Sequence, residues 1–232
     1  MILDILASNN TPLQIKLHSD KAKGHFFSPA SHINVILNEQ INRDKIYDFF
    51  FNGKTNLTVI DAGANVGIFS IFCSPSSKIV YAIEPTPDHY EILQETTQPF
   101  PNIQTINAAV WDKNEDVKFY IVDSNTTSNS ALYATNKFVN VKGKNLQTLI
   151  QEKNIDHVDL IKMDIEGSEF KVINDELLEF VYPIIDNWFL EVHPFTHYCS
   201  NYSQCKQIVI DKFTQHGYQV DHKGHDGLFI HK

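Results

Sequence analysis

From Leu57 onward, short apolar runs alternate with segments of helical periodicity, and this alternation leaves few possible folds. The runs cover residues 57–61, 78–84, 103–107, 158–164 and 184–193. Runs of this length are typical of strands buried on both faces, and helices between such strands imply parallel pairing. We therefore predict a doubly wound, mostly parallel, Rossmann-like α/β sheet. An antiparallel C-terminal hairpin, formed by residues 218–222 and 228–232, completes it.

The chain of 232 residues is long enough for one large domain, and it contains no internal repeat. We predict an N-terminal cap or lid at residues 1–52, with a helix at 39–51, followed by the main domain at residues 53–232. A polar stretch at residues 123–136 is too long for a simple connection. We expect this stretch and residues 25–50 to close over the ligand site.

Charge and cysteine content bear on the partner and the compartment. Lys and Arg number 19 against 28 Asp and Glu, and a formal net charge of −9 disfavours nucleic acid as a partner. Neither a membrane span nor a basic secretory start is present, so we expect a cytoplasmic protein. The three cysteines, Cys73, Cys199 and Cys205, form no C-x-x-C pair, which predicts reduced, buried thiols.

A glycine-rich turn follows the first buried run. Its sequence, DAGANVG, places Asp61, Gly63, Asn65 and Gly67 between a strand and a helix, which is the context of a nucleotide-binding turn. The spacing departs from the dinucleotide fingerprint, because Asn65 stands where a glycine is required and Gly67 arrives one residue early. A strand-end carboxylate suits an ammonium group, so the turn favours a ligand with an amino-acid end, such as S-adenosylmethionine (SAM). A purely structural glycine turn is the alternative.

Two further strand ends extend this cofactor site. Glu84 ends the second run, and its carboxylate can accept hydrogen bonds from both ribose hydroxyls. Asn107 and Ala108 end the third run, where an adenine would lie. The alternatives are that Glu84 is a surface residue and that Asn107 only forms a turn.

A second group of polar residues lies at the carboxyl ends of the last two runs. Lys162, Asp164 and Glu166 alternate along one strand end, and Glu191 and His193 repeat this arrangement on the next. We expect the strands at 57–61, 158–164 and 184–193 to be neighbours, which would bring these groups together beside the cofactor turn. Several titratable groups in one cleft are candidates for catalysis. The alternatives are that the two acids cap a helix predicted from Gly167 to Phe180, and that His193 only packs.

The combined segments resemble one family. DAGANVGIFS, AIEP, INAAVWD, LIKMDIEGSEF and LEVHP, in this order over about residues 57–195, are similar to the FkbM family of SAM-dependent methyltransferases. The resemblance implies a class I methyltransferase fold with SAM as cofactor. It also implies O-methylation of a hydroxyl on a small molecule, sugar or glycan.

Methylation of an alcohol requires a general base, because the hydroxyl is a weak nucleophile until its proton begins to leave. We predict His193 as the base, since an ordinary imidazole is mostly neutral at pH 7, with Asp164 as the second candidate and Glu166 and Glu191 in support. We assign no metal, although Mg²⁺ or Mn²⁺ bridging Asp164, Glu191 and His193 is an alternative. The rival functions are an NAD-dependent oxidoreductase and a SAM-binding domain without turnover.

Overall fold

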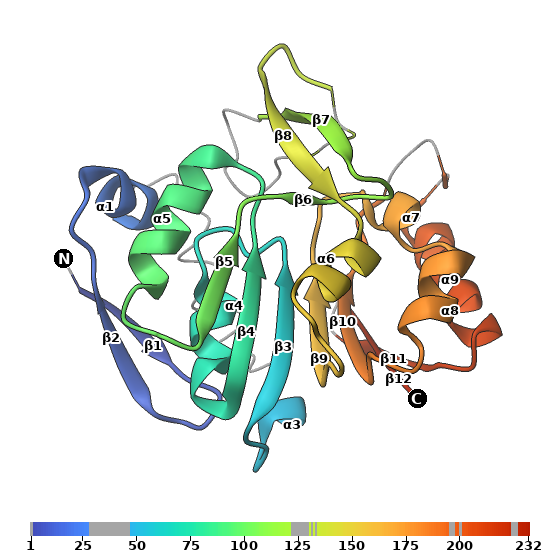
Figure 1. The fold of residues 1–232 in the computed structure, drawn as a ribbon, viewed down its shortest axis with the longest axis horizontal. Coiled ribbons are helices and arrows are strands. Elements are labelled where there is room, and N and C mark those ends of the chain that lie inside the picture. The colour runs from blue at the N-terminus through green and yellow to red at the C-terminus, as the bar shows by residue number, and fades with distance from the viewer. Residues whose placement is uncertain are drawn as a thin grey trace.

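The computed structural model describes residues 2–27, 47–121, 130, 132, 134–194, 198–199, 201–223 and 227–232. A seven-stranded sheet in the order β11-β12-β10-β9-β3-β4-β5 lies at its centre (Figure 1). Its strands are β3 (Leu57–Ala62), β4 (Ser77–Ile83), β5 (Ile103–Ile106), β9 (Leu160–Met163), β10 (Asn187–Glu191), β11 (Gln219–Lys223) and β12 (Gly227–His231). The strands from β10 to β5 are parallel, whereas β11 and β12 are antiparallel. The predicted α/β sheet with an antiparallel ending is confirmed.

Helices cover both faces of this sheet. They are α1 (Asp20–Phe27), α3 (Asp48–Phe51), α4 (Ile68–Cys73), α5 (Pro87–Thr97), α6 (Leu146–Glu152), α7 (Glu169–Val172), α8 (Asp175–Val181) and α9 (Tyr202–Gln215). Val59 and Phe189 share a buried cluster with α3 and α4, whereas Ile60 and Ile161 share another with α6, α8 and α9. Alternate side chains of one strand thus enter two cores, as expected for a doubly wound sheet. None of these helices is both long and apolar enough to span a membrane.

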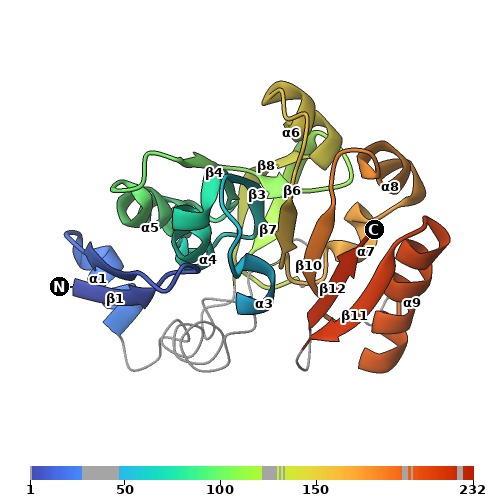
Figure 2. The ribbon, with the colours of Figure 1, turned by 90° about the horizontal axis from the view of Figure 1, so that it is seen from below.

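The N-terminal segment packs against the α4 and α5 side of the sheet. A hairpin of β1 (Ile2–Leu6) and β2 (Pro12–Lys16) leads into α1, which lies beside α5 (Figure 2). The Ser8 N–H donates to the Phe72 carbonyl at 2.9 Å, and the Glu95 carboxylate accepts the backbone N–H of Ser19 at 3.0 Å. The predicted cap at residues 1–52 stays a prediction, because residues 28–46, which include most of its predicted helix, lie outside the described residues.

A separate three-stranded sheet stands above the carboxyl edge of the central sheet in Figure 1. It contains β6 (Ala109–Val110), β7 (Glu115–Tyr120) and β8 (Phe138–Lys144) in the order β6-β8-β7. Much of the polar stretch that follows β7, residues 122–129, lies outside the described residues, so its role as a lid stays a prediction. The Ser130 hydroxyl, near the end of that stretch, donates to the Glu166 carbonyl at 2.6 Å.

The prediction of one continuous helix from Gly167 to Phe180 is wrong. The structure instead contains α7 and α8, separated by two residues. Asn174 has an extended backbone, and its side chain accepts the Leu177 N–H at 2.9 Å, which makes it the N-cap of α8. Both helices contribute apolar side chains to the same buried cluster, so the apolar residues alone did not reveal the break.

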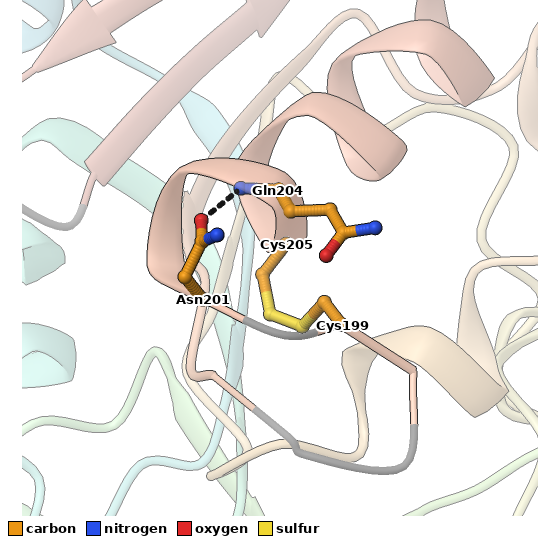
Figure 3. The surroundings of a disulfide bond; sticks show 4 residues. All are labelled: Cys199, Asn201, Gln204 and Cys205. Carbon is orange, nitrogen blue, oxygen red and sulfur yellow. Dashed lines mark hydrogen bonds between the residues drawn. A yellow bond between two sulfur atoms is a disulfide. The ribbon is translucent and has the colours of Figure 1, made fainter.

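The prediction of three reduced thiols is wrong for two of the cysteines. Cys199 and Cys205 form a disulfide (Figure 3), with their Cα atoms 5.3 Å apart. Cys73 is free and buried. Asn201 caps α9 by accepting the Gln204 N–H at 3.0 Å, and this turn brings Cys205 back toward Cys199. Disulfides persist in oxidising compartments, so the cysteines do not support the predicted cytoplasmic location.

Candidate active site

The predicted site residues meet at the carboxyl edge of the central sheet. Asp61 lies near the end of β3, Glu84 directly follows β4, Asp164 directly follows β9, and Glu191 ends β10. The strands β3, β9 and β10 are neighbours, as predicted. Ligands of doubly wound sheets bind at this edge.

The glycine-rich turn depends on backbone conformations that few residues adopt. Gly63, Asn65 and Gly67 have φ values of +82°, +51° and +88°. A Cβ on Gly63 would lie 1.9 Å from the Asp164 carbonyl oxygen, so only glycine lets the turn approach the chain after β9 this closely. The Asp164 N–H also donates to the Ala62 carbonyl at 3.0 Å. The cofactor turn and the catalytic candidates are therefore in direct backbone contact.

Glu84 is bonded to the same turn. Its buried carboxylate accepts the Asn65 N–H at 2.9 Å and the Thr86 N–H at 2.8 Å. Burial raises the pKa of Glu84 to about 7, although these hydrogen bonds act in the opposite direction. The nearby His89 does not counter this, because burial lowers its pKa to about 4 and leaves it neutral at pH 7. The alternative of a solvated surface glutamate is excluded.

Asn107 and Ala108 lie beside Glu84. The Asn107 side-chain amide donates to the Glu84 carbonyl at 2.9 Å and to the Pro85 carbonyl at 3.3 Å, so it holds the backbone after β4. Ala108 is buried. Their predicted role beneath an adenine is compatible with this position and stays a prediction.

Asp61 and Lys162 are buried charged residues on the neighbouring strands β3 and β9. Asp61 is fully buried, accepts the Ser70 hydroxyl at 2.6 Å and lies in register with Lys162 of β9. Burial raises the pKa of Asp61, and the Lys162 ammonium partly offsets this effect. The Lys162 Nζ donates to Asp164 Oδ2 at 3.0 Å. The charge of one buried ammonium thus acts both on Asp61 and on Asp164, one of the catalytic candidates.

His193 is surrounded by carboxylates. Its Nε2 lies 3.7 Å from Asp164 Oδ1 and 3.7 Å from Glu166 Oε2, and its Nδ1 lies 3.4 Å from Glu169 Oε1. Glu166 reaches this position although the strand has ended, because its left-handed backbone, with φ +54°, turns the side chain inward. Capping does not explain these acids, since α7 begins later and has Ser168 at its N-cap position.

Glu169 is the member of this cluster that the sequence analysis does not single out. It lies at the start of α7, is fully buried and accepts the Ile165 N–H at 3.0 Å. The alternation that indicated Lys162, Asp164 and Glu166 ends with the strand, so it could not reach a helical residue. The LIKMDIEGSEF segment contains Glu169, and that resemblance is the signal that could have found it.

The carboxylates change the protonation expected for His193. Burial lowers its pKa, but the hydrogen bond with Glu169 and the charges of Asp164 and Glu166 outweigh this and raise it well above the usual value. The prediction of a mostly neutral imidazole at pH 7 is therefore wrong for the protein without ligand. Burial raises the pKa of Glu166 to about 8, while Lys162 and His193 outweigh burial at Asp164 and lower its pKa.

The metal alternative meets its distance requirement. Ligand atoms of Asp164, Glu191 and His193 all lie within 4.8 Å of one another. The Lys162 ammonium already neutralises Asp164, which opposes a second cation at the same carboxylate. We therefore assign no metal to this site.

Comparisons with known proteins agree with this geometry. The family model described as "Methyltransferase FkbM domain" matches residues 61–220. Methyltransferase sdnD of Sordaria araneosa is 26% identical over 172 residues, an alignment that covers 58% of this chain and 66% of that protein. The chain thus spans about two thirds of the length of this curated relative.

Solved structures share the fold at low sequence identity. The fibrillarin pre-rRNA processing protein of Methanococcus jannaschii has a TM-score of 0.50 and 12% identity, over 77% of this chain and 66% of that one. The fibrillarin of Aeropyrum pernix, solved with natively bound SAM, has a TM-score of 0.47 and 11% identity, over 76% of this chain and 66% of that one. At such identities the likeness concerns the fold alone.

The family match begins at Asp61 and includes both halves of the site. The cofactor is S-adenosyl-L-methionine. On the strength of a match over more than half of its length, the chain belongs to the FkbM methyltransferase family.

Proposed function

We propose that this protein transfers the methyl group of SAM to a hydroxyl of a small molecule or glycan, with His193 as the general base. The observation that carries the proposal is the position of the His193 Nε2, which faces Asp164 and Glu166 directly beside the cofactor turn. No other imidazole among the described residues contacts this group of carboxylates.

The turn and Glu84 fit the cofactor. Each Glu84 oxygen accepts one backbone N–H, which leaves further lone pairs for the two ribose hydroxyls. Asn65 Oδ1 is buried without a hydrogen-bond partner among the described residues, so it can accept a donor from the ligand. Asp61 lies beneath the turn as a negative charge that favours the ligand's ammonium group.

When bound, SAM supplies a methyl group that is already strongly electrophilic. The chain's own residues must then orient the acceptor hydroxyl and take its proton. His193 Nε2 can accept this proton once the imidazole is neutral. Because the surrounding acids raise the pKa of His193, the basic form increases as the pH rises above the usual range of histidine. Asp164, held by Lys162, and Glu166 can accept hydrogen bonds from the acceptor or from the imidazolium.

The net charge of the site affects which class of acceptor it can bind. Asp164, Glu169 and Glu191 outnumber Lys162 and His193, whereas Glu166, with a pKa of about 8, is mostly protonated at pH 7, and the whole chain has a formal net charge of −9. Such a site repels polyanions and suits neutral or cationic acceptors that carry hydroxyls. Fibrillarin is named for pre-rRNA processing, but the likeness to it does not extend beyond the fold. A small molecule or glycan is therefore favoured over RNA.

The test is a measurement of S-adenosylhomocysteine formation against a panel of hydroxylated metabolites, glycans and short RNAs. Mass spectrometry of ligands that co-purify with the protein would guide the choice of acceptors. We expect turnover with an alcohol acceptor, loss of turnover in His193→Ala, and wild-type turnover in Glu179→Gln, which changes an exposed residue of α8.

The rival functions give different results in the same assays. SAM binding without S-adenosylhomocysteine formation on any acceptor would favour a domain without turnover. Binding of a nicotinamide cofactor in place of SAM would favour an oxidoreductase. Methylation restricted to RNA would refute the proposed acceptor class.

A further inference from the structure

Among the described residues, Glu169 is the one fully buried carboxylate in contact with His193, and the proposed chemistry gives it no role. Its Oε1 accepts the Ile165 N–H at 3.0 Å and lies 3.4 Å from His193 Nδ1. Its Oε2 is buried and has no hydrogen-bond partner among the described residues. A carboxylate in such a place is costly unless a positive or polar group compensates it, and His193 is the titratable group in contact with it.

We propose that Glu169 is the positioning residue of His193: its carboxylate holds the Nδ1–H of the imidazole and thereby directs Nε2 toward Asp164 and Glu166. This inference rests on the proposed role of His193 as the base. It adds that the base is half of a Glu–His pair, in which Glu169 comes from α7 and His193 from the segment that follows β10.

The orientation of the ring follows from hydrogen-bond chemistry. An ionised carboxylate only accepts hydrogen bonds, so the nitrogen that faces Glu169 must carry a hydrogen. The neutral ring then has its hydrogen on Nδ1 and a lone pair on Nε2, the atom that lies 3.7 Å from both Asp164 Oδ1 and Glu166 Oε2. A base needs this tautomer, because the lone pair must face the proton that it removes.

A structural role is the competing explanation, and it makes a different demand on the side chain. Glu169 supports the turn before it through the Ile165 N–H, next to the left-handed backbone of Glu166 and Gly167, with φ values of +54° and +95°. The amide oxygen of glutamine could accept that N–H equally well. Only the interaction with His193 requires a negative charge, because only an imidazolium is stabilised by it.

Several titratable groups face the imidazole of His193 besides Glu169. Asp164 follows β9, Glu166 lies in the turn, Glu191 ends β10, and Lys162 neutralises part of Asp164. Burial lowers the pKa of His193, and among the influences that raise it, the hydrogen bond with Glu169 is the largest. Removal of this one charge should therefore lower the pKa of His193 even though the other acids remain.

The test is the titration of His193 followed by NMR of the ¹⁵N-labelled imidazole rings, with the signal assigned from a His193→Gln spectrum. In the wild type we expect the neutral ring to carry its hydrogen on Nδ1. In Glu169→Gln we expect the pKa of His193 to fall by about one unit or more, which is a tenfold loss of proton affinity. Glu169→Asp keeps the charge and should recover part of this shift, and Glu179→Gln, on the exposed face of α8, should cause none.

Two results would overturn the inference. One is a wild-type neutral ring with its hydrogen on Nε2, a measurement that does not depend on whether any Glu169 variant folds. The other is an unchanged His193 titration in folded Glu169→Gln, which would leave Glu169 with the structural role alone.

Kinetics separates this inference from the proposed function. In Glu169→Gln we expect kcat to fall about 10- to 100-fold with unchanged SAM affinity, and the acidic limb of the pH–rate profile to move to lower pH. If the NMR results were as expected but His193→Ala kept full turnover, the Glu169–His193 pair would stand and the base role of His193 would fall.

Discussion

Because we propose that Glu84 binds the ribose, its raised pKa predicts that SAM affinity depends on pH. The ribose hydroxyls donate hydrogen bonds, so only the ionised carboxylate can accept them on both oxygens. Burial raises the pKa of Glu84 to about 7 in the protein without ligand. Binding must therefore remove a proton below that pH, and affinity should rise as the pH rises through 7.

The size of the effect follows from the ionised fraction. With a pKa of about 7, roughly one Glu84 in eleven is ionised at pH 6 and roughly ten in eleven at pH 8. The dissociation constant of SAM should therefore be about tenfold higher at pH 6 than at pH 8, which corresponds to ~1.4 kcal/mol. His89, with a pKa of about 4, stays neutral throughout this range and does not contribute.

Isothermal titration calorimetry in buffers of different ionisation enthalpy would measure both the affinity and the proton released. Glu84→Gln serves as the matched variant, because it keeps the size of the side chain and removes the titrating group. We expect it to weaken SAM binding by about 1.5–3 kcal/mol at pH 8. The amino group of the ligand itself titrates near pH 8, so the difference between wild type and variant is the decisive quantity. A difference that stayed constant from pH 6 to 8 would refute the linkage of Glu84 to the ribose.

Four further predictions follow from the site and the fold. His193→Ala should lower kcat by about 10²- to 10⁴-fold and remove the acidic limb of the pH–rate profile, without affecting SAM affinity; a retained limb would move the base to another group. Gly63→Ala should lower the free energy of unfolding by on the order of 4 kcal/mol or prevent folding, because the new Cβ would lie 1.9 Å from a backbone oxygen. The control is Gly53→Ala, with φ +73° and no atom within 4 Å of the new Cβ, which should lower the free energy of unfolding in urea by about 1 kcal/mol. Reduction of the disulfide between Cys199 and Cys205, which are six residues apart, should lower the free energy of unfolding by about 2 kcal/mol. An unfolding midpoint of the wild type that does not change when reductant is added would contradict this. Chelation of divalent cations should leave turnover unchanged; a loss restored by Mg²⁺ or Mn²⁺ would make His193 a metal ligand instead of a base.

The parallel strands of the central sheet, and the positions of the polar residues at their carboxyl ends, could be predicted from the sequence. Buried parallel strands have a simple pattern, and the rule that ligands bind at their carboxyl ends brought Asp61, Glu84, Asp164 and His193 to one edge. The glycines of the turn were informative because each occupies a backbone conformation that other residues rarely adopt.

Features that depend on the packing of separate elements could not be predicted. Glu169 reaches His193 from a different element, so no spacing along one strand or helix relates the two. The disulfide depends on how the chain before α9 folds back, and sequence separation alone does not determine this. The raised pKa of His193 depends on acids that only the tertiary structure assembles.

The ammonium of Lys162 also has a consequence for how the sheet assembles. Asp61 and Lys162 are cross-strand partners on β3 and β9, and both are buried. A slip of one residue would move Lys162 to the opposite face of the sheet, and a slip of two would place Val59 opposite it and leave the buried Asp61 without the ammonium that offsets its burial. A buried carboxylate that loses its compensating charge costs several kcal/mol, whereas a slip of two residues keeps the apolar side chains of a strand on the same face. The facing charges of Asp61 and Lys162 therefore favour one alignment of β3 and β9, and Lys162→Met should permit misaligned, aggregation-prone forms during refolding even where the native state remains stable.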